Sequence, residues 1–272
     1  MSSKPPRASV ESLVNATGAE VRALARSGSW TRPTAGLARG FVQANLVILP
    51  AAWSEEFADF CRLNDRPCPL LEQTMPGDPQ PRAFAPLADL RRDVPSYRVF
   101  RHGRALAAQS TDVRHLWRDD LVGFLLGCSF TFESALVAAG LGLRHLQEGR
   151  NVPMYRTSHQ CAPAGRFAGN LVVSMRPFLP ELVEQAVAIT SRYPTMHGPP
   201  IHVGDPEALG IRDLARPDFG QSVTIRSGEL PVFWACGVTP QLAICASGSP
   251  LAVTHSPGCM FVTDRRDQEF LV

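Results

Sequence analysis

Two segments of this chain resemble each other closely enough to predict a duplicated strand–turn–helix unit. They cover residues 124–140 and 232–248 and align without a gap. The identical pairs are Cys128 and Cys236, Thr131 and Thr239, Ala135 and Ala243, Ala138 and Ala246, and Gly140 and Gly248. Each copy has an apolar run, a small-residue turn with a cysteine, a Thr that can cap a helix, and a helix that ends at glycine. The pattern predicts two helix N-termini around one cleft; a chance match of two ordinary units is the alternative.

The start of each predicted helix is suited to hold an anion. The first turn of a helix has unpaired N–H groups and a partial positive charge, which together favour negatively charged ligands. Thr239 followed by Pro240 fits an N-cap and the first helical position, and Thr131 with Ser134 is a weaker version. We therefore expect carboxylate groups to bind here, although caps that only terminate their helices are an alternative.

Composition excludes several classes of partner. The 272 residues include 27 Lys and Arg against 25 Asp and Glu, which gives a net charge of +2. A field this weak does not attract nucleic acid or anionic membranes. All basic residues except Lys4 are arginines, and arginine grips carboxylates through two parallel hydrogen bonds. A small carboxylic or amino acid is the expected partner.

The cysteines and the N-terminus indicate a reduced, cytoplasmic protein. The seven cysteines are scattered without a C-x-x-C pair, so neither a disulfide framework nor a zinc site is expected. No signal pattern and no apolar run of about 20 residues is found. We expect no cofactor and no metal, and a homodimer is compatible with the sequence.

The order of predicted elements favours an α/β fold with two domains. Residues 171–175, 180–192, 201–203 and 223–225 predict strand, helix, strand and strand. This order predicts a smaller two-layer α+β domain at 158–228, inserted into a three-layer α/β/α domain formed by 1–157 and 229–272. Elsewhere we predict helices over 10–26, from Ser54 as a cap to Leu63, and from Asp112 to about 125, an element of unassigned type at 41–49 that Pro50 ends, and a hairpin around His102 and Gly103.

One group of polar residues can bind a carboxylate. Asn151, Tyr155 and Arg156 fall in one strand-like segment, where an amide and a guanidinium can point into one pocket. Arg176 can supply a second clamp. A solvated edge strand and structural arginines are the alternatives.

A second group can transfer protons or attack a substrate. His197 lies among Gly and Pro residues on a predicted loop, and His255 follows the second repeat. If the strands before Cys236 and at His255 are neighbours, a Cys–His pair forms at the end of a sheet. A solvent-facing His and a cysteine that only packs in the core are the alternatives. No G-x-S-x-G, P-loop or G-x-G-x-x-G motif occurs.

Several motifs resemble the bacterial hydro-lyase family related to D-glutamate cyclase. They run from about residue 36 to 266 and read FVQANLVILP, RPCPLLE, WRDDLVGFLLGCSF, EGRNVPMYRT, GNLVVSMRP, HGPPIHVGDP, PVFWACGVTPQ and THSPGCMFVTD. The resemblance implies a lyase of α/β fold, and cyclisation of D-glutamate to 5-oxo-D-proline expels water. In the family pattern a His usually follows the glycine, at the position where this chain has Cys259. Activity is altered here if that His is essential.

The resemblance gives the candidate residues their roles. We expect Arg156 and the helix start at Thr239 to bind carboxylates, with Tyr155 and Arg176 in support. We expect His255 or His197 to transfer protons, and Cys128, Cys236, Ser129 and Asn151 to line the pocket, react or donate to an oxyanion. The rivals are a hydro-lyase that abstracts a carbon-bound proton and a non-catalytic small-acid binding protein.

Overall fold

The computed structural model describes residues 9–272 and contains two antiparallel sheets, which confirms the mixed α/β class. The larger sheet has seven strands in the order β2-β5-β1-β10-β3-β4, and β11 also pairs with β1. Its strands are β1 (Phe41–Pro50), β2 (Leu70–Gln73), β3 (Tyr97–Arg101), β4 (Arg104–Ala105), β5 (Leu121–Gly127), β10 (Ala252–His255) and β11 (Phe261–Arg266). The smaller sheet has the order β6-β7-β9-β8. Its strands are β6 (Met154–Gln160), β7 (Asn170–Phe178), β8 (His202–Val203) and β9 (Leu230–Ala235).

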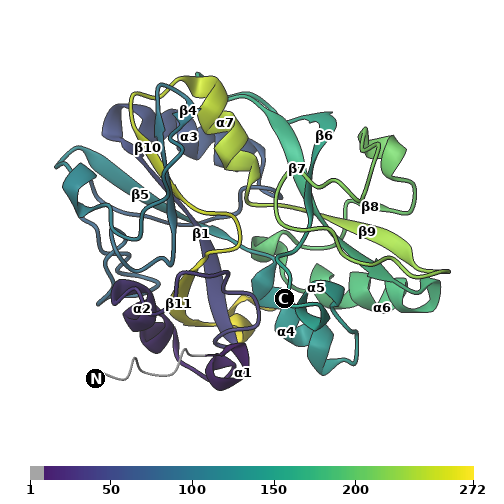
Figure 1. Cartoon of the computed structure of the whole chain (residues 1–272). Coiled ribbons are helices and arrows are strands. Elements are labelled where there is room, and N and C mark those ends of the chain that lie inside the picture. The colour runs from purple at the N-terminus through teal and green to yellow at the C-terminus, as the bar shows by residue number, and fades with distance from the viewer. Residues whose placement is uncertain (1–8) are drawn as a thin grey trace.

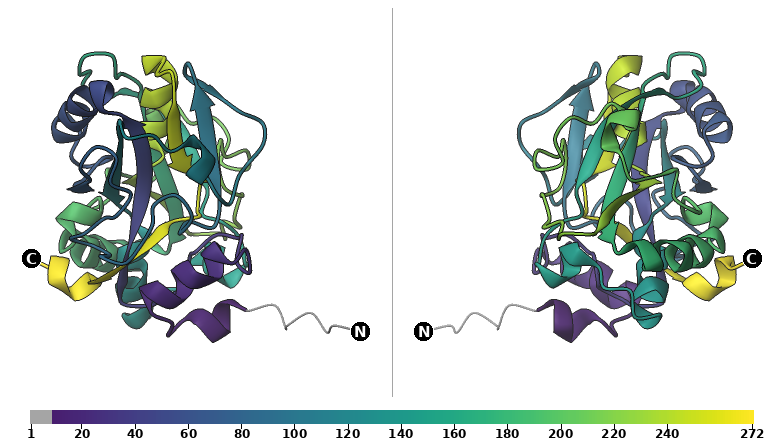
Figure 2. Two further views of the ribbon diagram at one scale, coloured as in Figure 1. Left: turned by 90° about the vertical axis from the view of Figure 1, so that its left-hand side faces the viewer. Right: turned by 90° about the vertical axis from the view of Figure 1, so that its right-hand side faces the viewer.

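The sheets lie side by side, with β1, β5 and β10 in one half of the molecule and β6 to β9 in the other (Figure 1). The α-helices are α1 (Val10–Leu13), α2 (Gly18–Arg26), α3 (Ala51–Leu63), α4 (Phe130–Ala138), α5 (Arg144–Gln147), α6 (Pro180–Ser191) and α7 (Thr239–Ser247). Short 3₁₀ turns cover Arg114–Leu116, Pro194–Met196, Pro206–Leu209 and Asp267–Phe270. Figure 2 shows α7 at the opposite end of the molecule from α1 and α2.

Aromatic residues hold the helices against the sheets. Phe57 of α3 meets Phe124 of β5 edge-on, with ring centres 4.9 Å apart. The rings of Phe132 of α4 and Trp234 of β9 pack together with their centres 6.0 Å apart. Both belong to a buried cluster that also includes Leu46 of β1. Because this cluster takes residues from both sheets, the two sheets share one core.

The strand orders of the two sheets correspond. In the order β2-β5-β1-β10, a short edge strand is followed by the strand before α4, the strand before α3, and the strand after α7. In the order β8-β9-β7-β6, a short edge strand is followed by the strand before α7, the strand before α6, and the strand after α4. The strand that follows each of α4 and α7 therefore lies in the other sheet.

The predicted threonine caps were wrong. Both threonines lie inside their helices, and the cap positions are held by Ser129 and Val238. The Thr131 Oγ1 accepts the N–H of Gln43 at 3.1 Å, and the Thr239 Oγ1 accepts the N–H of Val172 at 3.0 Å. Each hydroxyl is bound by the neighbouring strand instead of its own helix.

Four further predictions need correction. The helix over 10–26 is divided, because Thr17 and Glu20 form a capping box that starts α2. Ser54 is no cap, since α3 begins at Ala51 and the Ser54 hydroxyl donates to the carbonyl of Ala51. The helix from Asp112 is wrong, because the apolar residues 121–127 form strand β5 between β1 and β2. The strand at 223–225 is also absent from the described chain.

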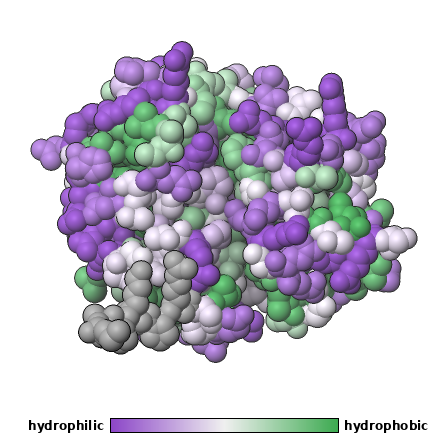
Figure 3. Space-filling model, in the orientation of Figure 1, coloured by the Kyte–Doolittle hydropathy of each residue, from purple (hydrophilic) through white to green (hydrophobic). Residues whose placement is uncertain are grey.

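The hairpin around His102 and Gly103, the strand at 171–175 and the helix from Pro180 are confirmed, and the element at 41–49 is strand β1. Among residues 9–272, no helix has the length and apolar character needed to cross a membrane. The face shown in Figure 3 has separate groups of hydrophobic residues among hydrophilic ones. The division at residues 158–228 stays a prediction about domain organisation.

Candidate functional site

The two related turns border one enclosed cavity. Cys128 and Ser129 lead into α4, and Cys236 and Gly237 lead into α7. The full lining consists of Asn45, Cys128, Ser129, Phe130, Val152, Met154, His197, Cys236, Gly237, Val238, His255, Gly258 and Met260. Five of the predicted site residues are therefore brought together. The start of each of the two helices faces the same space.

The cavity lies between the sheets and not at the end of one. The prediction that the strands at Cys236 and His255 are neighbours was wrong, because β9 belongs to the smaller sheet and β10 to the larger. Cys236 and His255 still line the same cavity, since the chain crosses from one sheet to the other through α7. The centre of a water molecule can occupy a volume of about 20 Å³ inside the cavity. This volume is slightly more than one buried water needs.

His255 is a neutral ring with its free N–H in the cavity wall. Its Nδ1 lies 3.1 Å from the backbone nitrogen of Leu46, which can only donate. Nδ1 also lies 3.3 Å from the Leu46 carbonyl oxygen; because the contact with the N–H is the shorter one, we assign Nδ1 as the acceptor and place the proton of the neutral ring on Nε2. Nε2 is buried and has no hydrogen-bond partner in the described chain. Burial, with a smaller contribution from the charge of Arg98, lowers the pKa of His255 to about 4.

His197 has the opposite tautomer. Its Nδ1 lies 2.6 Å from the carbonyl oxygen of Arg66, which can only accept. Nδ1 therefore carries the proton and Nε2 is left with its lone pair. Burial lowers the pKa of His197 to about 4. The residue also has a left-handed backbone with φ of 80°, a strained conformation for a side chain of this size and one that is common in functional sites.

The cysteines are buried thiols that close the turns. The Cys128 Sγ accepts the N–H of Phe130 at 3.5 Å, and Cys236 is bound in the same way by the N–H of Val238. Burial raises the pKa of Cys236 to about 11 and raises that of Cys128 well above its usual range. Thiols in this state are weak nucleophiles. The geometry favours packing and turn closure for both sulfurs.

Arg176 is held by protein groups behind the cavity. Its Nε donates to Glu133 Oε1 at 3.0 Å, and its Nη2 donates to Ser129 Oγ, also at 3.0 Å. Burial opposes ionisation of Glu133, but the charges of His145 and Arg176 outweigh it and lower the pKa of Glu133 to about 2. The pair Arg176 and Glu133 therefore supports Ser129. We predicted no role for Glu133 and His145, although a glutamate in an apolar helical run is a signal of a buried ion pair.

A solvent-filled groove of about 600 Å³ lies beside the cavity. Asn151 and Pro257 line it, and the Asn151 Nδ2 donates to the Pro257 carbonyl at 3.1 Å. The Asn151 amide packs against Gly258, which lines the cavity and leaves no space there for a Cβ. One side chain thus separates groove and cavity. The Asn151 Oδ1 is buried without a hydrogen-bond partner in the described chain.

Arg98 is the cation of this groove, and the sequence reasoning missed it. Its Nη1 donates to Gln241 Oε1 at 3.1 Å, and the Gln241 Nε2 donates to the carbonyl of His255, also at 3.1 Å. Arg98 is therefore tied to the same strand end as the histidine. The available signal was the position of Arg98 in the predicted hairpin, because alternate residues of a strand point to the same face of the sheet.

Three predicted binding residues lie outside the cavity. The Arg156 side chain is 56% exposed and lies 3.6 Å from Asp218, above the ring of Phe219, which lines the groove. The Tyr155 hydroxyl donates to the Leu214 carbonyl at 2.7 Å on the other face of the smaller sheet. Thr239 is buried in the contact with β7 described above. Cys259 is also buried, between two residues that line the cavity.

Comparisons with known proteins identify the family of the chain. Residues 122–264 match the family model described as D-glutamate cyclase. A protein of Rubrobacter xylanophilus named "Putative hydro-lyase" is 61% identical over 93% of this chain and 98% of its own length. The protein "Putative hydro-lyase YcsI" of Bacillus subtilis is 51% identical over 93% and 98%. The chain belongs to the D-glutamate cyclase family.

Among solved structures, the chain is similar to a nitrogen repressor-like protein of Methanococcus jannaschii. The match covers 92% of this chain and 98% of that protein, with 8% sequence identity and a TM-score of 0.35. A likeness at this level supports no conclusion about fold or function.

Proposed function

We propose that this protein is a hydro-lyase that removes water from a small carboxylic or amino acid, and that D-glutamate is its substrate and 5-oxo-D-proline its product. Membership of the D-glutamate cyclase family supports the reaction class. The observation that carries the proposal is the pair of neutral histidines with opposite tautomers in one cavity. One ring offers a lone pair and the other offers a proton, as a dehydration requires.

The cyclisation forms one C–N bond and breaks one C–O bond. The amine attacks the side-chain carboxyl carbon, and His197 Nε2 accepts a proton from the ammonium group. His255 Nε2–H donates a proton to the departing oxygen. His197 then passes its proton to the same oxygen, and the second proton of the nitrogen restores the His255 ring, so both rings end neutral and the oxygen departs as water. A low pKa keeps both rings neutral before the substrate binds, so base and acid are available together at neutral pH.

The two helix starts stabilise the tetrahedral oxyanion in this proposal. Within residues 9–272, the backbone N–H groups of Ser129 and Gly237 form no hydrogen bond. They lie at equivalent positions of the two turns, and both residues line the cavity. N–H groups at the start of a helix are favourable donors to a developing negative charge.

Arg98 holds the α-carboxylate in this proposal. Asn151 is the wall between groove and cavity, and its unpartnered Oδ1 is available to a bound amine or water. The cavity in its closed form is far too small for an amino acid, so the contact of Asn151 with Pro257 opens when substrate enters. Arg156 lies farther along the groove, where it attracts acids to the entrance.

Incubation of the protein with D-glutamate, L-glutamate and 5-oxoproline, followed by NMR, tests the proposal. We expect conversion of the D-isomers, and a loss of at least 100-fold in rate for His197→Asn and His255→Asn. His115→Asn is the matched control, because His115 is exposed and does not line the cavity. Absence of conversion in both directions would remove the cyclase assignment.

Two other functions remain distinguishable by the same experiment. A hydro-lyase that abstracts a carbon-bound proton would place deuterium on carbon when the reaction runs in heavy water, whereas simple cyclisation would not. A non-catalytic acid-binding protein would show a thermal shift with acidic ligands, no turnover, and unchanged binding in His255→Ala.

We also propose that the two halves of the site arose from one duplicated unit. The corresponding strand orders and the equivalent bonds of Thr131 and Thr239 support this. The unit extends to β1 with α3 and β7 with α6, because Pro50 and Leu179 have nearly identical backbone angles before the two helices. Duplication explains why two similar turns face one cavity.

A further inference from the structure

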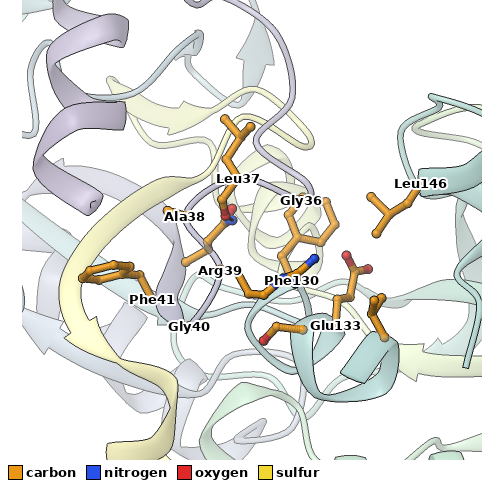
Figure 4. Close-up of a pocket in the computed structure, with 12 residues that line it drawn as sticks. Gly36, Leu37, Ala38, Arg39, Gly40, Phe41, Phe130, Glu133 and Leu146 are labelled. Atoms are coloured by element: carbon orange, nitrogen blue, oxygen red, sulfur yellow. Dashed lines mark hydrogen bonds between the residues drawn. The ribbon is translucent and has the colours of Figure 1, made fainter. Parts of the chain in front are cut away.

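A second pocket lies beside the catalytic cavity, on the other side of the start of α4. The loop of residues 36–40 forms one wall, and Phe130, Glu133, Val137 and Leu146 form the other. About 50 Å³ of the pocket is open to the centre of a water molecule, against about 20 Å³ in the catalytic cavity, and the space not occupied by atoms is about 410 Å³, including solvent at the mouth. Figure 4 shows the loop facing Phe130, Glu133 and Leu146. Phe130 also lines the catalytic cavity, so the two spaces share a wall.

One oxygen of Glu133 has no hydrogen-bond donor. Glu133 is only 3% exposed. Its Oε1 is bound by Arg176, with His145 Nε2 3.1 Å away. Its Oε2 is buried and has no hydrogen-bond partner among the described residues. A buried carboxylate oxygen in this state is destabilising until a donor reaches it.

The protein itself offers few donors on this side. The backbone N–H groups of Leu37, Ala38 and Arg39 donate to the carbonyls of Thr34, Leu13 and Val14. The opposite wall is apolar apart from Glu133 and Ser134, and the Ser134 hydroxyl is bound to Asp267. The Arg39 side chain at the edge of this pocket forms no hydrogen bond or ion pair with Glu133 among the described residues, so in this structure the missing donor is a water molecule or a ligand with N–H groups.

The walls define the chemistry of such a ligand. Phe130, Val137 and Leu146 suit a short apolar side chain. Arg39 is exposed at the edge of the pocket and forms no ion pair within residues 9–272, so it is available to a carboxylate. An anionic oxygen, an apolar wall and a guanidinium are complementary to an ammonium, an apolar side chain and a carboxylate.

We infer that this pocket is a second binding site, distinct from the catalytic cavity, for an α-amino acid with an apolar side chain. The ammonium group donates to Glu133 Oε2 and the carboxylate pairs with Arg39. Glu133 Oε1 continues through Arg176 to Ser129 Oγ in the wall of the catalytic cavity. Occupation of the pocket therefore bears on the position of Ser129, and the site is placed to regulate turnover.

Calorimetric titration with leucine, 3-methylbutylamine and 4-methylpentanoate tests the inference. We expect leucine to bind at millimolar concentration or below, the amine to bind about tenfold more weakly, and the acid not to bind, because the charge-assisted bond to Glu133 is the larger contribution. Absence of leucine binding, or equal binding of leucine and the acid, would overturn the inference and leave water as the partner of Glu133.

Variants of residues in and outside this pocket distinguish loss of the site from damage to the fold and from changes in the catalytic cavity. Glu133→Gln removes the charge but also weakens the support of Arg176. Val137→Trp instead fills the pocket from the partly exposed face of α4, with Leu179→Trp as the control of similar exposure outside it. We expect Val137→Trp to lose leucine binding at least tenfold and Leu179→Trp to keep it. His197→Asn should keep it as well, so failure of the proposed dehydration leaves this result intact.

Discussion

The two cavity histidines make a large, defined contribution to the pH dependence of stability. Each has a pKa lowered from 6.5 to about 4 by burial. Between these values the unfolded chain binds protons that the folded protein excludes, so stability falls as the pH falls. The contribution is fully present above pH 6.5 and is lost progressively as the pH falls toward 4.

The magnitude follows from the displaced pKa. A change from 6.5 to about 4 corresponds to roughly 3 kcal/mol for each histidine, most of which is lost between pH 7 and pH 4.5. The lower limit of pH 4.5 keeps most of the titration of Glu133 out of the comparison. Its pKa is lowered from 4.5 to about 2, so its contribution is lost mainly below that pH.

The assay is urea unfolding at pH 7 and pH 4.5, followed by tryptophan fluorescence. His197→Asn and His255→Asn are the informative variants, because the Asn amide can replace Nδ1 as donor to Arg66 or as acceptor from Leu46. Each variant should lose about 2–3 kcal/mol less than the wild type over this pH range, whatever its stability at pH 7.

His115→Asn is again the control, because an exposed side chain leaves the difference between the two pH values unchanged. The reasoning is refuted if both cavity variants lose as much stability as the wild type. In that case the histidines are protonated in the folded protein, and the neutral pair required by the proposed dehydration does not exist.

Three further outcomes are expected. Gly258→Ala should destabilise the protein by about 1–3 kcal/mol in thermal unfolding, because φ is 86° and a Cβ would meet the Asn151 amide; unchanged stability would show that this wall moves freely. Arg98→Met should raise KM for the acid at least tenfold with a smaller effect on kcat, since a lost charge-assisted bond costs about 1.5–3 kcal/mol; an unchanged KM would exclude Arg98 from substrate binding. Cys128→Ala and Cys236→Ala should keep turnover within about tenfold, because their raised pKa keeps both as thiols; loss of all activity in either would identify a nucleophile.

The meeting of the two turns could be predicted from the sequence because it depends on repeated local patterns. Cys128 and Cys236 occupy equivalent positions, and a repeated unit tends to place its copies around a shared axis or cleft. His255 could be added because it follows the second copy closely. The roles of the cysteines were less predictable, since buried packing and nucleophilic attack use the same residue type.

The remaining parts of the site depend on contacts between distant segments. Arg98 reaches His255 through Gln241, and Arg176 reaches Ser129 directly. No spacing rule connects such residues. The same limit explains why the residues of strand β5 were predicted as part of a helix. An apolar run of seven residues fits either a buried helix or a buried strand until its neighbours are known.

The structure also explains why the proposed acid and base have fixed and different roles. The tautomer of each ring is determined by a backbone group of another segment, the Leu46 N–H for His255 and the Arg66 carbonyl for His197. A backbone partner does not titrate and cannot be exchanged by substitution. Strand β10, which carries His255, pairs with β1, the strand of Leu46. Because the strand after α7 crosses to the other sheet, the fold that encloses the cavity also sets which histidine can give a proton and which can take one.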